Sequence, residues 1–166
     1  PITSHQKKLS ALCAIVGAES TSKDLESIEL SGIAQASQSV LPGDLFIALP
    51  GEKFHGAQFA SDAISRGAVA VLTDANGAKE IKGVPVLIST NPRRAAGIAS
   101  AWFYSEPMRD LYSVGVTGTN GKTTVTTLLH QIMTAAGRDS GLIGTVETRI
   151  GVESIASKRT TPESSD

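Results

Sequence analysis

The segment Gly115-Val116-Thr117-Gly118-Thr119-Asn120-Gly121-Lys122-Thr123-Thr124 carries the clearest structural signal in this chain. A short β-rich run at 114–117 precedes the later glycines, and apolar residues at helical spacing from Val125 to Ala136 follow it, up to Gly137. The segment is therefore predicted to be a turn that joins a strand to the N-terminus of a helix, as in an α/β fold.

The residue types in this turn suit a phosphate group. The glycines let the backbone approach a ligand, and the free amides and positive dipole end of the helix attract phosphate oxygens. Lys122 is expected to reach the β- and γ-phosphates of ATP as the catalytic residue, and the Thr123 hydroxyl is expected to bind Mg²⁺. The predicted ATP site comprises Gly118, Thr119, Asn120, Gly121, Lys122, Thr123 and Thr124, with ATP and Mg²⁺ as cofactors.

One position departs from the general phosphate-loop pattern, which has a glycine five residues before Gly121 where this chain has Val116. A glycine- and threonine-rich turn that exists for packing alone is the alternative interpretation. The lysine and the two threonines at the start of an amphipathic helix favour phosphate binding. The motif does not identify the phosphate acceptor.

The region before this turn alternates between predicted helices and strands, which indicates an α/β layer architecture. Asn91 and Pro92 are typical first residues of a helix, here one that buries Ala95, Ile98 and Trp102. The other expected elements are a helix at 9–16, strands at 28–33 and 45–49 separated by a turn at 41–44, a helix with Phe59, Ala60, Ala63 and Ile64 on its buried face, and strands at 68–72 and 84–88.

Pro107 is expected to end the helix that begins at Pro92, and we place a domain boundary near residue 108. A second domain at 109–166 would then contain a strand from about Leu111, the helix after the phosphate loop, and a strand at 142–146. So few elements cannot cover both faces of a sheet, so this domain is expected to be incomplete and the chain to be an N-terminal piece.

Composition narrows the function classes. The chain is 40% hydrophobic with a net charge of −1, and it has no apolar run of membrane-spanning length, so neither a membrane span nor a broad nucleic-acid surface is expected. Its single cysteine, Cys13, fits a reducing, cytoplasmic compartment, and its spacing with Leu9 and Leu12 predicts a buried, inert thiol. No zinc-site spacing and no Ser-His-Asp arrangement is evident.

Four segments together resemble the Mur ligases, which are ATP-dependent amide ligases of peptidoglycan precursor synthesis. They are Val114 to Thr124, Pro42-Gly43-Asp44-Leu45-Phe46-Ile47-Ala48-Leu49-Pro50-Gly51, Gly141-Leu142-Ile143-Gly144-Thr145 and Thr160-Thr161-Pro162-Glu163. The phosphate loop alone is also similar to that of folylpolyglutamate synthetases. The other three segments resemble the tripeptide synthetase branch, which adds a diamino acid, diaminopimelate or lysine, to UDP-N-acetylmuramoyl-L-alanyl-D-glutamate.

This resemblance implies a role for each domain. Residues 1–108 would be the small UDP-substrate domain, 109–166 would begin a P-loop-type ATPase domain with a mainly parallel sheet, and the C-terminal domain that selects the amino acid would be absent. The intact enzyme would phosphorylate the D-glutamyl carboxylate, and the amine of the diamino acid would attack the acyl phosphate. This chain alone is expected to be inactive, and its partners would be the UDP-muramoyl-dipeptide and the diamino acid, with the protein a monomer.

The resemblance also implies substrate-binding positions, which are Gln35, Ser37, Glu52, Lys53, Phe54, His55, Thr160 and Thr161. Gln38 departs from the pattern because many relatives have arginine after the serine. Without the resemblance, Gln35 and Ser37 are more typical of turn residues, and His55 is more typical of a loop histidine.

Two other function classes stay open from the sequence. One is a non-catalytic module that binds a nucleotide or a UDP-sugar, and the other is an unrelated P-loop NTPase. The segments at 42–51 and 160–163 disfavour the unrelated NTPase.

Overall fold

The structure is a computed structural model, and it describes residues 7–151 and 153–156. These residues divide into two compact units, with the division between Asp110 and Leu111. None of the helices in the described ranges combines the length and the apolar character that a bilayer span requires.

The first unit is built on a five-stranded, mainly parallel sheet, which confirms the α/β layer architecture expected from the sequence. Strand β2 pairs antiparallel with β7 at one edge, and the other neighbouring strands are parallel. The strand order across the sheet is β2 (Glu19–Ser20), β7 (Val86–Ile88), β6 (Ala70–Thr73), β5 (Asp44–Ile47) and β4 (Gly32–Ala34).

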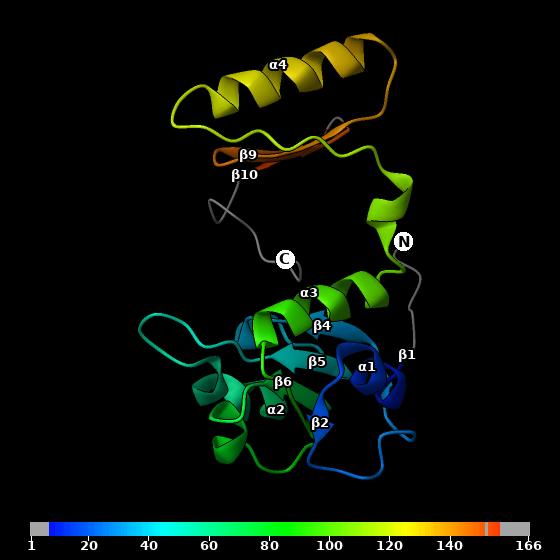
Figure 1. Ribbon diagram of the computed structural model, residues 1–166, viewed down its shortest axis with the longest axis vertical. Coiled ribbons are helices and arrows are strands. Elements are labelled where there is room, and N and C mark those ends of the chain that lie inside the picture. Colours follow the sequence, from blue (N-terminus) through cyan, green and yellow to red (C-terminus); the bar gives the residue numbers. More distant parts are fainter. Residues whose placement is uncertain (1–6, 152, 157–166) are drawn as a thin grey trace. The chain divides into compact units, whose positions relative to one another are not determined.

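Helices cover both faces of this sheet, and α3 and α2 lie on opposite sides of β5 and β6 (Figure 1). Helices α1 (Leu9–Val16) and α3 (Pro92–Phe103) pack with Leu45, Ile47 and Leu72 on one face. Helix α2 (Ala60–Ser65) packs with Phe46 and Val71 on the other. Successive residues of β5 thus enter opposite cores, which explains why its sequence is continuously apolar. Short 3₁₀ helices are η1 (Ser37–Ser39), η2 (Gly56–Phe59), η3 (Gly77–Glu80) and η4 (Pro107–Asp110).

Local signals placed several boundaries correctly. Gly17 ends α1 with φ of 61°, and the Asn91 side chain accepts a hydrogen bond from the Arg94 N–H at 3.0 Å, with Pro92 as the first residue of α3. The expected turn closes through a 3.1 Å hydrogen bond from the Asp44 N–H to the Leu41 carbonyl. Boundaries that depend on residues adjacent in sequence were therefore predictable.

Other expectations were wrong. The strand expected at 28–33 is two strands, because the chain changes partner at Ser31: β3 (Glu29–Leu30) pairs with β1 (Lys7–Lys8), and β4 pairs with β5. Phe59 is 46% exposed rather than buried.

Helix α3 buries Ala95, Ala96, Ala99 and Phe103 more fully than Ile98 and Trp102, which are half-buried. Small alanine side chains let the helix backbone approach the sheet closely. Cys13 is also half-buried; its thiol donates to the Ala18 carbonyl at 3.1 Å, and burial raises its pKa, which keeps it protonated and inert.

The second unit contains α4 (Lys122–Ala135) and an antiparallel sheet of β8 (Gly141–Ile143), β9 (Glu147–Ile150) and β10 (Glu153–Ala156). Figure 1 shows α4 along one side of this sheet, where it contacts β8. The strand expected from Leu111 through Thr117 is not formed, and this segment makes no ladder of hydrogen bonds with any described strand. The expected strand at 142–146 is the shorter β8, which ends before Gly144.

Helix α4 leaves much of its apolar face exposed. The exposed fractions of Val125, Leu128 and Ile132 are 50%, 53% and 62%. Within the described part of this unit, His130 and Leu142 are the buried side chains. The second unit therefore buries little apolar surface by itself.

Candidate functional site

The predicted phosphate loop leads directly into the N-terminus of α4. Gly121 immediately precedes the helix with φ of 80°, and Gly118 has φ of 149°, so both occupy conformations that favour glycine. Gly118, Thr119, Asn120, Thr123 and Thr124 are exposed. The turn thus presents its backbone to solvent at the positive end of a 14-residue helix.

The amides of this turn are open to a ligand. Among the described residues, no carbonyl or side-chain oxygen accepts a hydrogen bond from the N–H groups of residues 118–124. The first intrahelical bond is donated by the Val125 N–H to the Gly121 carbonyl at 2.9 Å. The N–H groups of Lys122, Thr123 and Thr124 are therefore free to bind an anion.

The Lys122 side chain folds back over the turn. Its ammonium group donates to the carbonyl oxygens of Gly118 at 2.5 Å and Thr119 at 3.3 Å. Both acceptors are exposed carbonyls that water can satisfy, so transferring the ammonium to a phosphate oxygen exchanges two neutral acceptors for a charged one. The lysine therefore lies in the turn, with its ammonium group held by two backbone carbonyls.

The metal chemistry of this region fits magnesium bound through a nucleotide. The described residues contain no group of three or more histidine, cysteine or acidic side chains that could hold a metal ion. Thr123 has an exposed side chain beside the open amides, and its hydroxyl is one oxygen donor of the kind that Mg²⁺ prefers. The residues present therefore fit a Mg²⁺ ion whose other ligands are phosphate oxygens and water.

A second set of predicted residues gathers at the carboxyl ends of β4 and β5. Because these strands are parallel, the segments that follow them, Gln35 to Ser37 and residues 50–55, meet at one edge of the sheet. Gln35 is half-buried. This edge brings together the substrate positions predicted before residue 60.

Ser37 differs from the others because only 3% of it is exposed. Its hydroxyl hydrogen-bonds to the Asp62 carboxylate, which also pairs with the Arg66 guanidinium at 3.1 Å. The bond from Ser37, followed by that from Arg66, lowers the pKa of Asp62. Ser37 thus links η1 to α2, a role that the sequence did not indicate.

The loop after β5 exposes its three middle side chains. A β-bridge between Pro50 and His55 and a 3.0 Å hydrogen bond from the Gly51 N–H to the Phe54 carbonyl close the loop. Glu52, Lys53 and Phe54 all point into solvent-accessible space, with Phe54 64% exposed. This part of the predicted substrate region is accessible to a ligand.

Both ring nitrogens of His55 are engaged within the protein. Nδ1 accepts from the Ala57 N–H at 3.0 Å, and Nε2 lies 3.1 Å from Asp74 Oδ1. The Gly77 N–H bond first, and then the contact with His55, lower the pKa of Asp74. The sequence analysis missed Asp74, and its only signal was a turn-like Asp-Ala-Asn-Gly run after β6.

The remaining predicted positions, Thr160 and Thr161, lie outside the described residues.

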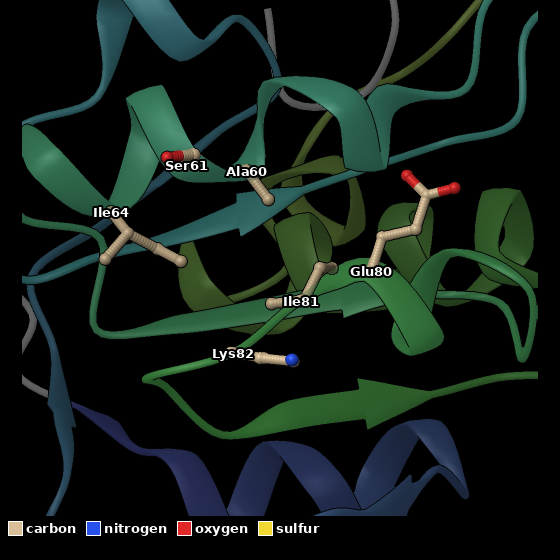
Figure 2. Close-up of a pocket in the computed structure, with 6 residues that line it drawn as sticks. All are labelled: Ala60, Ser61, Ile64, Glu80, Ile81 and Lys82. Atoms are coloured by element: carbon tan, nitrogen blue, oxygen red, sulfur yellow. The ribbon is translucent and has the colours of Figure 1, made fainter.

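Two cavities in the first unit are separate from the predicted sites. Figure 2 shows one of about 220 Å³ between α2 and η3, which is lined by Ala60, Ser61, Ile64, Glu80, Ile81 and Lys82. The other, of about 370 Å³, lies between the end of α1 and the start of α3.

Family comparisons cover most of the chain. A model described as the Mur ligase family, catalytic domain, matches residues 29–104, and one described as the Mur ligase middle domain matches residues 116–166. Together the two models match both described units.

Individual proteins align with nearly the whole chain. A UDP-N-acetylmuramoyl-L-alanyl-D-glutamate--2,6-diaminopimelate ligase from Streptomyces avermitilis is 47% identical over 95% of this chain and 31% of its own length. A UDP-N-acetylmuramyl-tripeptide synthetase from Leifsonia xyli is 42% identical over 96% of this chain and 31% of its own length. The chain thus spans 31% of the length of each of these two relatives.

A solved structure of a UDP-N-acetylmuramoyl-L-alanyl-D-glutamate--2,6-diaminopimelate ligase aligns with 96% of this chain and 31% of its own chain, with a TM-score of 0.69. The two sequences are 22% identical over that alignment, so the likeness supports the fold.

Proposed function

This chain belongs to the Mur ligase family, and from that premise we propose that it forms the first part of an ATP-dependent amide ligase. The enzyme adds a diamino acid, diaminopimelate or lysine, to UDP-N-acetylmuramoyl-L-alanyl-D-glutamate in the cytoplasm. The observation that carries this proposal is the open set of amides at the N-terminus of α4, with Lys122 folded beside them.

The proposed reaction has two steps. The D-glutamyl carboxylate attacks the γ-phosphorus of ATP, and the bond from that phosphorus to the bridging oxygen breaks, which gives an acyl phosphate and ADP. The amine of the diamino acid then attacks the acyl carbon, loses a proton and displaces inorganic phosphate. The products are therefore one amide, ADP and phosphate.

The residues of the phosphate loop have separate roles in this proposal. The N–H groups of residues 118–124 hold and orient the phosphates, since Gly118 and Gly121 keep the backbone uncovered. Lys122 leaves the carbonyls of Gly118 and Thr119 and places its charge on the γ-phosphoryl oxygens, where negative charge shifts during transfer. Thr123 would hold a Mg²⁺ ion through its hydroxyl, and this ion would supply further charge neutralisation.

The first unit binds the UDP end of the substrate. Its surface for this purpose is the sheet edge with Gln35, Ser37 and the loop from Glu52 to His55, and Thr160 and Thr161 contact the muramoyl-peptide part. The chain spans 31% of the length of its Streptomyces avermitilis relative, so the proposed activity needs more than these 166 residues. Turnover belongs to the intact ligase, which we propose acts as a monomer.

The test is Lys122→Ala in the intact ligase, with ADP release measured in the presence and absence of UDP-N-acetylmuramoyl-L-alanyl-D-glutamate. We expect substrate-dependent kcat to fall by about 10²–10³, the range for losing one transition-state charge contact. Lys79→Ala removes an exposed lysine whose ammonium group, among the described residues, donates to Asn76 Oδ1 at 3.2 Å, and it serves as the control. Retained turnover in Lys122→Ala contradicts the role of the lysine, and wild-type protein that does not respond to the UDP substrate contradicts the function.

A further inference from the structure

Three contacts fasten the carboxyl end of β5 to that of β6. The buried Thr73 hydroxyl donates to the Ala48 carbonyl at 2.8 Å. The His55 ring lies against Asp74 through the 3.1 Å Nε2–Oδ1 contact. A Cβ added to Gly77 would lie 2.6 Å from His55 Cε1, so the imidazole packs directly on the backbone that follows β6. The loop at 50–55 is thus attached to β6 through His55.

Asp74 is a fixed partner for this histidine. Its Oδ1 atom also accepts hydrogen bonds from the Asn76 N–H at 3.0 Å and the Gly77 N–H at 2.7 Å. Three donors therefore converge on one carboxylate oxygen, which holds the carboxylate in a single orientation. The side chains of His55 and Asp74 are 21% and 24% exposed, so water competes weakly for the pair.

The hydrogen bonds also fix the tautomer of His55. Nδ1 accepts from the Ala57 N–H, so the ring proton is on Nε2 and is donated to Asp74. Both nitrogens are then used, and a ligand could bind either one only after a bond within the protein breaks. This arrangement suits a residue that positions the loop better than one that contacts a substrate.

The exposed part of the loop depends on this attachment. Glu52, Lys53 and Phe54 make no side-chain hydrogen bond or ion pair with any other described residue. Their placement is set by the ends of the loop, which are held by the Pro50–His55 bridge, by backbone hydrogen bonds from Gly51 to Phe54 and from Gly56 to Leu49, and by the His55–Asp74 contact. The contact to Asp74 is the side-chain contact that joins this loop to the segment after β6, so losing it would leave the backbone bonds within the loop and to β5.

We propose that His55 and Asp74 are a positioning pair that holds residues 52–54 in place for the UDP-sugar end of the substrate, with His55 making no direct substrate contact. This inference rests on the proposed function, in which the loop forms part of the UDP-sugar pocket. The pair acts by keeping the loop ordered before the substrate arrives, so that less conformational entropy is lost on binding.

The test is a double-mutant cycle in the intact ligase with His55→Asn, Asp74→Ala and the combination. Asparagine can still cap Ala57 through its Oδ1 atom but does not extend to Asp74. We expect each single variant to raise KM for the UDP-muramoyl-dipeptide about tenfold, as for loss of one charge-assisted hydrogen bond, with kcat and KM for ATP unchanged. The double variant should resemble the single ones, because both remove the same contact.

Two further variants complete the design. His55→Gln places an N–H donor near Asp74, and it should restore part of the lost affinity. Asp24→Ala removes an exposed carboxylate whose partner within the described part of the chain is Ser27, and it should leave all three constants unchanged.

Three outcomes overturn the proposal. A KM increase in His55→Asn without one in Asp74→Ala means that His55 contacts the substrate directly. A lower kcat with unchanged KM in both variants means that the pair supports folding alone. Unchanged constants in both variants mean that the loop does not need the pair. Wild-type protein that shows no turnover with the UDP substrate overturns the proposed function, and the ligand assigned to this loop with it.

Discussion

Gly77→Ala is a sharp test of the packing at the carboxyl end of β6. An added Cβ would lie 2.4 Å from Thr73 Oγ1, 2.6 Å from His55 Cε1 and 3.1 Å from Ala57 Cβ. The φ angle of Gly77 is not in the left-handed region, so the backbone itself accepts alanine. Any loss of stability therefore reports the crowding around the new methyl group.

The structure allows an estimate of the cost. To relieve the clash with its hydroxyl, Thr73 must turn away from the Ala48 carbonyl, and to relieve the clash with its ring, His55 must move away from Asp74. Each movement breaks one hydrogen bond, and each lost bond costs about 1 kcal/mol of stability. Overpacking in general costs about 1–3 kcal/mol, so we expect a loss of about 2 kcal/mol. With an m-value of about 1–3 kcal/mol/M, the urea midpoint should fall by about 1 M.

The assay is urea unfolding followed by tryptophan fluorescence. The chain has one tryptophan, Trp102, which lies on α3, so the signal reports the first unit. Gly115→Ala is the matched control, because no atom lies within 4 Å of the position of its added Cβ. Equal midpoints for Gly77→Ala and Gly115→Ala would refute the close packing of His55 and Thr73 around this glycine.

Three other predictions follow. Asn91→Ala removes the cap on the Arg94 N–H and should lower the free energy of unfolding by about 1 kcal/mol. Asn76→Ala is the control, because Asn76 precedes η3 without capping it through its side chain, and it should lower the free energy of unfolding less. Equal losses in the two variants would argue against the Asn91 cap. Asp74 has a lowered pKa in the folded state, so its ionised form stabilises the fold above its ordinary pKa, and that contribution is lost as the pH falls through the folded value. The stability difference between wild type and Asp74→Asn should therefore shrink as the pH falls from about 5 to below about 3.9, and a constant difference would contradict this. In hydrogen exchange of the 166-residue chain, amides of α4 should exchange faster than those of β5 and β6, because Leu128 and Ile132 are exposed; equal protection would show that α4 is packed.

Sequence reasoning succeeded where neighbouring residues determine the structure. The ends of α1 and α3 follow from Gly17, Asn91 and Pro92, whose effects act within one helical turn. Prediction failed where the local structure depends on residues that are far apart in the sequence. The break at Ser31 arises because β3 and β4 belong to different sheets, and the absent strand before the phosphate loop has no described neighbour to pair with.

The same distinction explains which parts of the candidate site could be predicted. The predicted phosphate loop is contiguous, so its glycines, lysine and threonines could all be proposed from one segment. The partners of the substrate-region residues come from other elements: Asp62 from α2 for Ser37, and Asp74 from the end of β6 for His55. Asp62 is 25 residues from Ser37 in the sequence, and Asp74 is 19 residues from His55, so folding alone brings each carboxylate to its partner. No local sequence pattern marks such pairs.

The phosphate loop keeps its open amides although the strand expected before it is not formed. The proposed anion site therefore depends on the N-terminus of α4 and on the conformations of Gly118 and Gly121, which are local properties. A strand paired into a sheet would fix the position of a bound phosphate relative to the carboxylate that attacks it in the proposed reaction. Phosphoryl transfer needs this fixed position, because the attacking oxygen and the phosphorus must be held within about 3–3.5 Å of each other. Anion binding and the proposed phosphoryl transfer thus place different demands on this chain, and the open amides suit the first without the sheet that the second requires.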